Sequence, residues 1–343
     1  MKVLFTNNYD ANIKQVDWSS GRAGSEHLWG LPELVAAGHA VNCLPFRAGD
    51  LASLTRCGSW PQQWRILARH DYDLLYAGAH PLVNGLALAR AGGLYPKPIV
   101  AICHHGLPGG RVPALQARGF DRLIFLSTEI ARQATKLHPG LKDRAVVLDW
   151  GFDLNYHRPM PEPGKYLIAA GKTGRDYDTL CLALAKAPVP TRIFCSADSA
   201  PRVAVPDGVS ISAGAHNQNA VSDFEMQSWY AQSFAVAIPL QEQPYLLGLT
   251  SLLDAMVHAK AVILTRTPFI DIDVDAEGCG ISVAPGDTEG WAKGIRFLQE
   301  HPGEAERMGR RGRGLCEQRY HAAAFGQALA GLLVDLAQDR DTK

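Results

Sequence analysis

The sequence predicts an α/β protein of two domains, each built on a parallel β-sheet with helices on both faces. Short β-rich runs alternate with helical patterns in the first half, and a second series of the same kind follows. Strands that alternate with helices favour parallel sheets. Between the two series lies 158–164 (RPMPEPG), whose prolines can continue neither a helix nor a central strand. We therefore expect the interdomain linker there.

The first domain is expected at 1–157. Its strands are predicted where apolar and β-branched residues cluster, at 3–6, 40–44, 74–77, 99–103, 123–126 and 146–148. Apolar residues at helical spacing predict helices at 25–37, 61–69 and 128–137. Ser127 fits an N-cap for the last of these helices. A long polar loop is expected between the first strand and Gly21.

The second domain is expected at 164–319 and repeats the alternation. Its strands are predicted at 166–170, 192–196, 209–212, 235–239, 261–264 and 281–284. Its helices are predicted at 177–185, 222–232, after Gly248 and at 289–300. The tail from Gly303 to Gln338 predicts two more helices, of which the last is rich in alanine and leucine.

Composition narrows the class of protein. The chain is 47% apolar, which is normal for a soluble globular protein, and no run approaches the ~18 apolar residues of a membrane span. The first residues predict a strand rather than a signal peptide. The seven cysteines include no CxxC pair, which favours reduced thiols. We therefore expect a cytoplasmic protein.

The two halves differ in charge, although the net charge is zero. Residues 1–150 hold 16 Lys and Arg against 11 Asp and Glu, whereas the remainder holds 18 against 23. Either this is chance surface variation, or the first domain faces an anionic acceptor or the inner face of a membrane. No basic run is dense enough to predict nucleic-acid binding.

The helix predicted after Gly248 carries the most specific signal in the chain. Its apolar residues recur at helical spacing on one face: Leu249, Leu252, Leu253, Met256 and Val257. The opposite face carries a polar stripe: Thr250, Ser251, Asp254 and His258. Free N–H groups and the positive dipole end after Gly248 suit a phosphate, and Asp254, about one turn further, suits a sugar diol.

The pieces around this helix follow a recognisable order. Leu252-Leu253-Asp254-Ala255-Met256 is followed by Lys260-Ala261-Val262-Ile263 and, after Gly280, by Pro285-Gly286-Asp287. This order resembles the donor-binding half of retaining glycosyltransferases of family 4. Members of that family have the GT-B fold, in which two Rossmann-like domains face a central cleft. The first of the family's two glutamates falls on Leu246 here, and Glu242 is the acid that could substitute from the loop.

Two further turns of the second domain fit the donor site. Gly171-Lys172-Thr173-Gly174-Arg175 follows its first strand, where the family has Gly-Arg and then a lysine. Both cations are expected to point from this glycine-flexed loop and to neutralise a pyrophosphate. The turn Gly214-Ala215-His216, after the third strand, is expected to flank the base.

The first domain offers fewer signals. Cys103-His104-His105-Gly106 follows its fourth strand, where the resemblance implies a histidine that faces the reacting sugar. The alternative is plain loop structure, and no third ligand at a recognisable spacing supports a metal. Gly24 matches half of the family's glycine pair, or is a simple helix-entry turn. Trp150-Gly151-Phe152-Asp153 resembles the family's hinge, with Asp153 expected to cap a turn.

The resemblance implies a hexosyltransferase-type enzyme that moves a sugar from a nucleotide-diphosphate sugar to a glycan, lipid-linked or small-molecule acceptor. Retention of configuration and independence of metals and other cofactors are implied as well. It implies that the last helix, within 320–343, crosses back to the first domain. The expected catalytic residues are His104, His105, Lys172 and Arg175. The expected donor-binding residues are Gly24, Gly171, Gly214, Ala215, Gly248, Leu249, Thr250 and Asp254.

Two alternatives to this reading stay open. The chain could be a non-catalytic sugar-nucleotide or glycan-binding protein, because Leu246 replaces a polar group of the family's donor site. It could also be a sugar-nucleotide epimerase of the same GT-B fold.

Overall fold

A computed structural model describes residues 1–159, 164–215 and 221–341 of the chain. The chain forms two compact units, one of Met1–Asp153 with His321–Lys343 and one of Leu154–Tyr320. Most of the predicted proline-rich linker (160–163) and His216 of the predicted base-flanking turn lie outside the described residues. Among the residues described, no helix is both long and apolar enough to cross a membrane.

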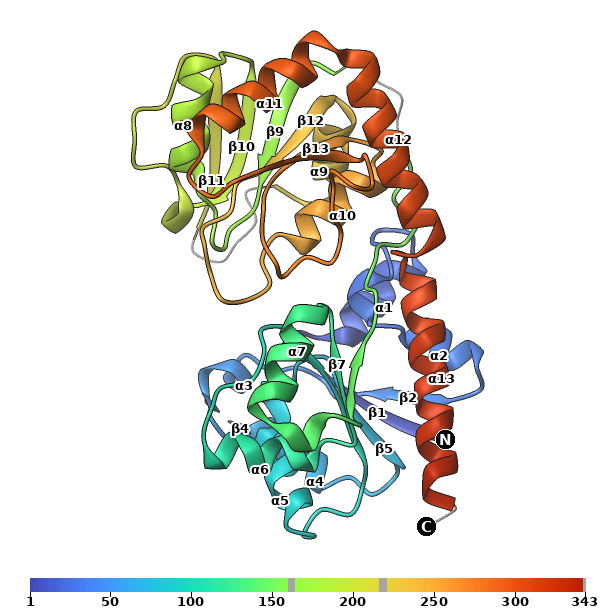
Figure 1. Ribbon diagram of the computed structural model, residues 1–343. Coiled ribbons are helices and arrows are strands. Elements are labelled where there is room, and N and C mark those ends of the chain that lie inside the picture. Colours follow the sequence, from blue (N-terminus) through green and yellow to red (C-terminus); the bar gives the residue numbers. More distant parts are fainter. Residues whose placement is uncertain (160–163, 216–220, 342–343) are drawn as a thin grey trace. The chain divides into compact units, whose positions relative to one another are not determined.

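Unit 1 contains a six-stranded parallel sheet in the order β2-β1-β5-β6-β7-β8 (Figure 1). Its strands are β1 (Lys2–Thr6), β2 (Ala40–Cys43), β5 (Leu74–Ala77), β6 (Ile99–Cys103), β7 (Arg122–Phe125) and β8 (Ala145–Val147). A short antiparallel ribbon, β3 (Leu54–Thr55) with β4 (Gly58–Ser59), precedes β5. β1, β5 and β6 are apolar and almost fully buried because helices cover both faces of the sheet.

The helices of unit 1 lie between these strands, and the last helix of the chain joins them. They are α1 (Ala11–Ser19), α2 (Leu31–Ala36), α3 (Gly49–Ala52), α4 (Trp60–Leu67), α5 (Asn84–Ala91), α6 (Arg111–Gly119), α7 (Thr128–Leu137) and α13 (Ala322–Asp341). α13 packs on α2, as Figure 1 shows. The predicted N-cap of α7 is confirmed, because Ser127 Oγ accepts the N–H of Ile130 at 3.4 Å.

Two predictions in this unit are wrong in detail. The single helix expected at 25–37 is a 3₁₀ turn at Glu26–Leu28 followed by α2, because Trp29 and Gly30 take left-handed backbone angles between them (φ 53° and 79°). A Cβ on Gly30 would lie 2.8 Å from Gly326 Cα, so α13 approaches closely here. The polar loop expected after β1 contains α1, which Asp10 caps.

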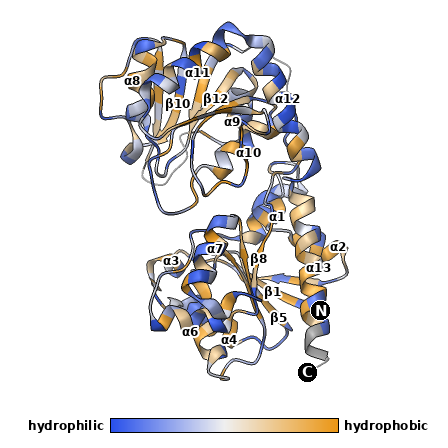
Figure 2. Cartoon of the chain, viewed as in Figure 1, coloured by the Kyte–Doolittle hydropathy of each residue, from blue (hydrophilic) through white to orange (hydrophobic). Residues whose placement is uncertain are grey.

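Unit 2 contains a second six-stranded parallel sheet, in the order β11-β10-β9-β12-β13-β14. Its strands are β9 (Tyr166–Ala170), β10 (Thr191–Ser196), β11 (Val209–Gly214), β12 (Ser233–Ile238), β13 (Ala261–Thr265) and β14 (Gly280–Val283). The predicted α/β class with two parallel sheets is therefore confirmed. Figure 2 shows that the strands are the most hydrophobic parts of this unit.

Helices cover both faces of this sheet as well. They are α8 (Tyr177–Lys186), α9 (Asp223–Ala231), α10 (Leu249–Val257), α11 (Thr288–Glu300) and α12 (Pro302–Gln318). α8 and α11 pack together over a core that includes Trp291, Leu180 and Ile263. α10 and α12 pack together and both contact β13.

The strand order places a switch point in each sheet. In unit 1 the chain moves to opposite sides of β1, so the switch lies between β1 and β5. In unit 2 it lies between β9 and β12. Ligands of open α/β sheets bind beyond the carboxyl ends of the strands at such points. The loops after β1 and β9 are therefore the expected ligand-binding edges of the two sheets.

We predict that Gly119→Ala lowers the free energy of unfolding by about 2 kcal/mol, because overpacking displaces neighbouring backbone. A Cβ at Gly119 would lie 1.7 Å from the carbonyl oxygen of Ala87, where α6 meets α5. Urea unfolding measures the change. Gly314→Ala is the control: no atom lies within 4 Å of its Cβ position in α12, so helix propensity should leave stability equal or higher. Equal effects of the two substitutions would contradict the packing.

Candidate functional site

The loop after β9 wraps around an arginine. Gly171 takes a φ of 155°, and a Cβ there would lie 2.2 Å from Arg175 Nε. Only glycine leaves room for the guanidinium to fold back against the start of the loop. Gly174 (φ 59°) continues the turn, where a side chain would collide with Leu247.

Arg175 is 8% exposed and lies behind this loop. Its Nη2 donates to Ser251 Oγ at 2.8 Å and its Nη1 to the carbonyl oxygen of Thr173 at 2.9 Å, while Nε has no hydrogen-bond partner. Within the described part of the chain, no carboxylate forms an ion pair with this guanidinium. Burial lowers the pKa of Arg175. Arg175 was expected to point from this loop towards a pyrophosphate; the missing Cβ of Gly171 lets its side chain turn inward instead.

Lys172, by contrast, is half-buried on the same loop. The loop is fixed from below, because the buried Tyr177 hydroxyl donates to the carbonyl oxygen of Gly171 at 2.8 Å. Lys172 and Arg175 therefore place two positive charges at the carboxyl end of β9, one near the surface and one beneath it.

The first turn of α10 lies against this loop. Gly248 takes a left-handed φ of 81° at the N-cap, and helical hydrogen bonding starts with Leu252 N–H donating to the Gly248 carbonyl at 2.9 Å. Leu249 is half-buried and Thr250 is exposed in that first turn, whose amides have no acceptor within the helix. Ser251 belongs to the predicted polar stripe and is buried, because its hydroxyl accepts from Arg175 and donates to the Ala170 carbonyl at 3.0 Å.

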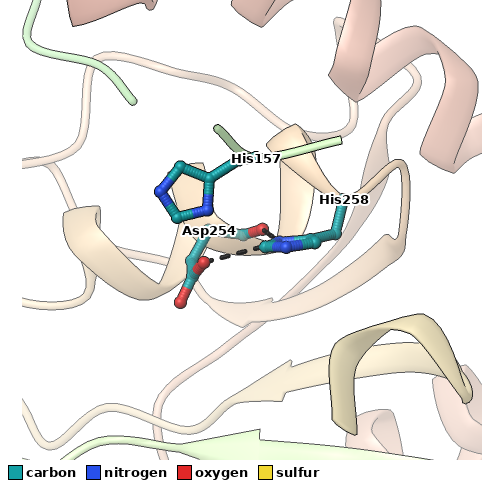
Figure 3. Close-up of side chains that lie close together, drawn as sticks. All are labelled: His157, Asp254 and His258. Carbon is teal, nitrogen blue, oxygen red and sulfur yellow. Dashed lines mark hydrogen bonds and ion pairs between the residues drawn. The ribbon is translucent and has the colours of Figure 1, made fainter. Parts of the chain in front are cut away.

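Asp254 lies one turn further along α10, within a cluster of polar rings. The Tyr230 hydroxyl hydrogen-bonds to its carboxylate, and burial raises the pKa of Tyr230 well above its usual value. His258 lies one turn beyond, with Nδ1 at 3.5 Å from Asp254 Oδ1, and its ring stacks on Tyr230 at 5.2 Å. His157 meets the His258 ring edge-on at 5.5 Å from another segment (Figure 3). Asp254 keeps an exposed fraction of 21%, so it can meet a ligand.

His157, Asp254 and His258 are also the candidate metal ligands among the described residues, since one ligand atom of each lies within 4.8 Å of the others (Figure 3). Two features oppose a cation there. His258 Nδ1 donates to the Asp254 carbonyl at 2.8 Å, which occupies that nitrogen. Burial, together with the nearby His157, Lys260 and Arg313, lowers the pKa of His258 to about 4, so positive charge is disfavoured there. The cluster is better suited to holding the Asp254 carboxylate in place.

A pocket of about 370 Å³ opens at the carboxyl ends of β12 and β13. Glu242 and Arg266 line it, together with Phe269. Leu246, at the position of the family's first glutamate, is 8% exposed and packs inward. Glu242 is therefore the acidic side chain that the loop after β12 brings to this pocket.

Gly214 ends β11, and Ala215 follows in an exposed bend. β11 is two strands away from β9 in the sheet, across β10. This separation is about 10 Å. Gly214 and Ala215 therefore lie at the same edge of the sheet as the β9 loop, but not in contact with its backbone.

In unit 1 the corresponding edge carries His104. Its Nε2 donates to the Gly78 carbonyl at 2.8 Å, which leaves Nδ1 as the acceptor, and its ring packs edge-on against Trp29 at 5.1 Å. Burial lowers the pKa of His104, so the ring is neutral at pH 7. His105 is exposed, with its ring centre 6.2 Å from that of His104.

Gly24 leaves room for the Glu26 carboxylate and does not present its backbone to a ligand. A Cβ there would lie 2.2 Å from Glu26 Oε2, and this carboxylate accepts the N–H of Asp153 at 3.2 Å. Asp153 returns the contact by accepting Ser25 N–H at 3.2 Å, and Trp150 Nε1 donates to the Glu26 carbonyl. The expected hinge residues are thus tied to the turn after α1.

Comparisons with known proteins identify the fold. No family model matches the chain, and no curated protein matches its sequence. Sucrose-phosphate synthase from Thermosynechococcus elongatus is similar over 99% of this chain and 100% of that chain, with a TM-score of 0.71 and 14% identity. HepE from Anabaena in complex with UDP has a TM-score of 0.67 and 15% identity over 98% and 100% of the two chains.

WaaG, a glycosyltransferase involved in lipopolysaccharide biosynthesis, has a TM-score of 0.62 and 12% identity over 96% of this chain and 99% of that chain. At such identities the likeness establishes architecture alone. The chain therefore has the GT-B fold, as predicted.

The structure brings together most of the donor-side residues that the sequence singles out. Gly171, Lys172, Arg175, Gly248 and Asp254 all come from the β9 loop and α10. Sequence reasoning missed the partners of Asp254 outside its own helix, Tyr230 and His157. No spacing connects these residues to position 254, so only the three-dimensional structure finds them.

We predict that His258 makes stability depend on pH between about 6.5 and 4. Its pKa of about 4 in the folded state lies below the ordinary value of about 6.5 in the unfolded chain, so its contribution is present above pH 6.5 and is lost as pH falls towards 4. This amounts to about 3 kcal/mol. Urea unfolding of His258→Asn should show a flatter pH profile than wild type, whereas exposed His70→Asn should not. Parallel profiles for wild type and His258→Asn would refute the assignment.

Proposed function

We propose that the chain is a glycosyltransferase that transfers a sugar from a nucleotide-diphosphate sugar to an acceptor. Unit 2 binds the donor at the β9–β12 switch point, and unit 1 binds the acceptor. The GT-B fold supports this proposal by analogy, and two similar HepE structures are complexes with UDP and with UDP-glucose. The chemistry of the site itself supports it independently.

The observation that carries the proposal is the buried, uncompensated charge of Arg175. Burying a cation without a counter-ion costs on the order of several kcal/mol. The protein therefore gains if an anion binds close by. The β9 loop adds Lys172, and the first turn of α10 adds free N–H groups and a positive dipole end. A diphosphate has the charge and the size for this combination.

In this scheme Lys172 and the amides of Leu249 and Thr250 contact the diphosphate, while Arg175 holds the loop against α10 and raises the local positive potential. As the bond to the sugar breaks, negative charge grows on the leaving diphosphate. Fixed positive groups interact more strongly with the transition state, which carries this extra negative charge, than with the bound substrate. The difference lowers the activation barrier. Arg175 is thus a positioning and electrostatic residue rather than a direct contact.

Asp254 accepts from the ribose hydroxyls in this proposal. The Tyr230 hydroxyl hydrogen-bonds to this carboxylate and fixes its orientation. The sugar occupies the pocket beside β12, where Glu242 takes over the part of the family's first glutamate. Retention of configuration and turnover without a divalent cation, as in the family that the sequence resembles, belong to the same proposal.

A non-catalytic sugar-nucleotide-binding protein is the second candidate. The observation that favours it is Leu246, which buries an apolar side chain where the family has a sugar-binding carboxylate. Both candidates bind a nucleoside diphosphate. Incubation with UDP-, GDP-, ADP- and TDP-sugars separates them, because only a transferase releases the nucleoside diphosphate by transfer or slow hydrolysis.

We predict that Lys172→Ala weakens nucleoside diphosphate binding by about 1.5–3 kcal/mol, the range of charge-assisted hydrogen bonds. Arg175→Gln should also weaken binding, because it removes the positive potential behind the loop. Calorimetry on the folded variants measures this. Arg175→Gln should leave the melting temperature of the ligand-free protein equal or higher, because it removes an unpaired buried charge. Exposed Lys293→Ala, on α11, is the control. If both site variants bind like the control, the donor site is elsewhere.

We predict that His104→Ala reduces kcat at least about tenfold while leaving diphosphate affinity unchanged, because general acid–base or hydrogen-bonding groups act on the reacting hydroxyl. His104 Nδ1 is the neutral acceptor at the carboxyl edge of unit 1. His105→Ala, which removes the exposed neighbour, serves as the comparison and should have a smaller effect. Wild-type turnover in both variants would make this pair loop structure.

A further inference from the structure

Helix α4 buries two glutamines and exposes two tryptophans, the reverse of the usual pattern in which polar side chains face solvent. Gln62, Gln63 and Ile66 are at most 1% exposed, whereas Trp60 and Trp64 are 47% and 66% exposed. The glutamines are fixed inside by hydrogen bonds: Gln62 Nε2 donates to the Asn7 carbonyl at 2.8 Å, and Gln63 Oε1 accepts Leu86 N–H at 2.8 Å. The orientation of α4 is therefore determined, and its tryptophans cannot turn inward.

The exposed tryptophans belong to a larger apolar surface. Leu67 adds to it from the end of α4 and is 42% exposed. α3 packs on α4, and Leu51 of α3 is 44% exposed. Leu54 pairs with Ser59 across the β3–β4 ribbon directly before α4 and is 42% exposed. We call these five side chains the tryptophan face. Exposed apolar side chains gathered on three consecutive elements are typical of an interaction site.

Most charges around the tryptophan face are positive; the exposed Asp71, directly after this segment, is paired with Arg69. Residues 47–70 contain four arginines and one acid, Asp50. Asp50 is fully buried, and Arg65 Nη2 contacts it at 2.5 Å. Arg47 and Arg56 are exposed, and neither forms an ion pair with a carboxylate of the described chain. Two guanidinium groups therefore remain for an anionic partner.

We propose that the tryptophan face docks unit 1 on an anionic lipid surface. Tryptophan favours the boundary between headgroups and acyl chains, because its ring is apolar while its N–H stays hydrated. Arginines beside it add attraction to anionic headgroups. A protein partner of opposite charge would also fit the arginines, but two exposed indoles one helical turn apart, beside two arginines without a carboxylate partner in the described chain, favour a bilayer.

The location of α4 adds to this inference. Gln62 ties the start of the helix to Asn7, immediately after β1, at the carboxyl edge of the sheet where the proposed acceptor binds. An enzyme held to a bilayer by this face meets acceptors carried by lipids. The docking itself does not depend on the transferase proposal, because it requires only the surface.

Co-sedimentation with vesicles tests the docking without any activity measurement. Wild-type protein should bind vesicles of phosphatidylglycerol and phosphatidylcholine in equal parts, with a blue shift of tryptophan emission, and should bind pure phosphatidylcholine weakly. The Trp60→Gln/Trp64→Gln double variant should lose binding about tenfold or more, with an unchanged melting temperature. Arg47→Gln/Arg56→Gln should lose the preference for anionic vesicles. Leu182→Gln, an exposed apolar residue of unit 2, is the control and should bind like wild type.

Absence of wild-type binding to the anionic vesicles at low salt would overturn the proposal. So would undiminished binding by the folded tryptophan double variant. A wild-type dimer that the tryptophan substitutions dissociate, with no vesicle binding, would assign the face to a second copy of the chain and would also overturn it.

Discussion

The charge of Arg175 is the constraint on which the candidate site depends. It is buried because Gly171 has no side chain, and it is held there by Ser251 and by the Thr173 carbonyl. Neutral partners satisfy some of its N–H groups but leave its charge uncompensated. The β9 loop, the start of α10 and the carboxyl end of β9 are all joined through it. An anion bound at this junction would offset the free energy that is lost by burying the unpaired guanidinium.

The first turn of α10 and its later turns have different roles in the proposed site. Its first turn is left free of side-chain caps, since Gly248 offers none. Its later turns hold Asp254 and His258 beside Tyr230 and His157, which come from two other segments. The helix therefore offers positive backbone groups at its start and one oriented carboxylate a turn later. This is the arrangement that the proposed donor site assigns to a diphosphate and the ribose beside it.

Much of the fold could be predicted because it depends on local patterns. The six strands of each sheet are predicted by short apolar runs, and the start of α7 is predicted by Ser127 as its N-cap. The break at Trp29 and Gly30 could not be predicted, because it depends on α13, which approaches Gly30 from nearly 300 residues away. Burial of Arg175 and Ser251 escaped prediction for a similar reason: helical periodicity places a residue on a face but does not tell what covers that face. The inverted α4 has the same origin, since its glutamines are drawn inward by Asn7 and Leu86, distant in sequence.

The most direct test is a crystal structure of the protein with the nucleoside diphosphate that it binds most tightly among UDP, GDP, ADP and TDP. The account predicts phosphate oxygens within about 3 Å of Lys172 Nζ and of the Leu249 or Thr250 amides, with ribose hydroxyls on Asp254 and Arg175 still buried behind the loop. A diphosphate bound at any other edge of unit 2, or in unit 1, would contradict it.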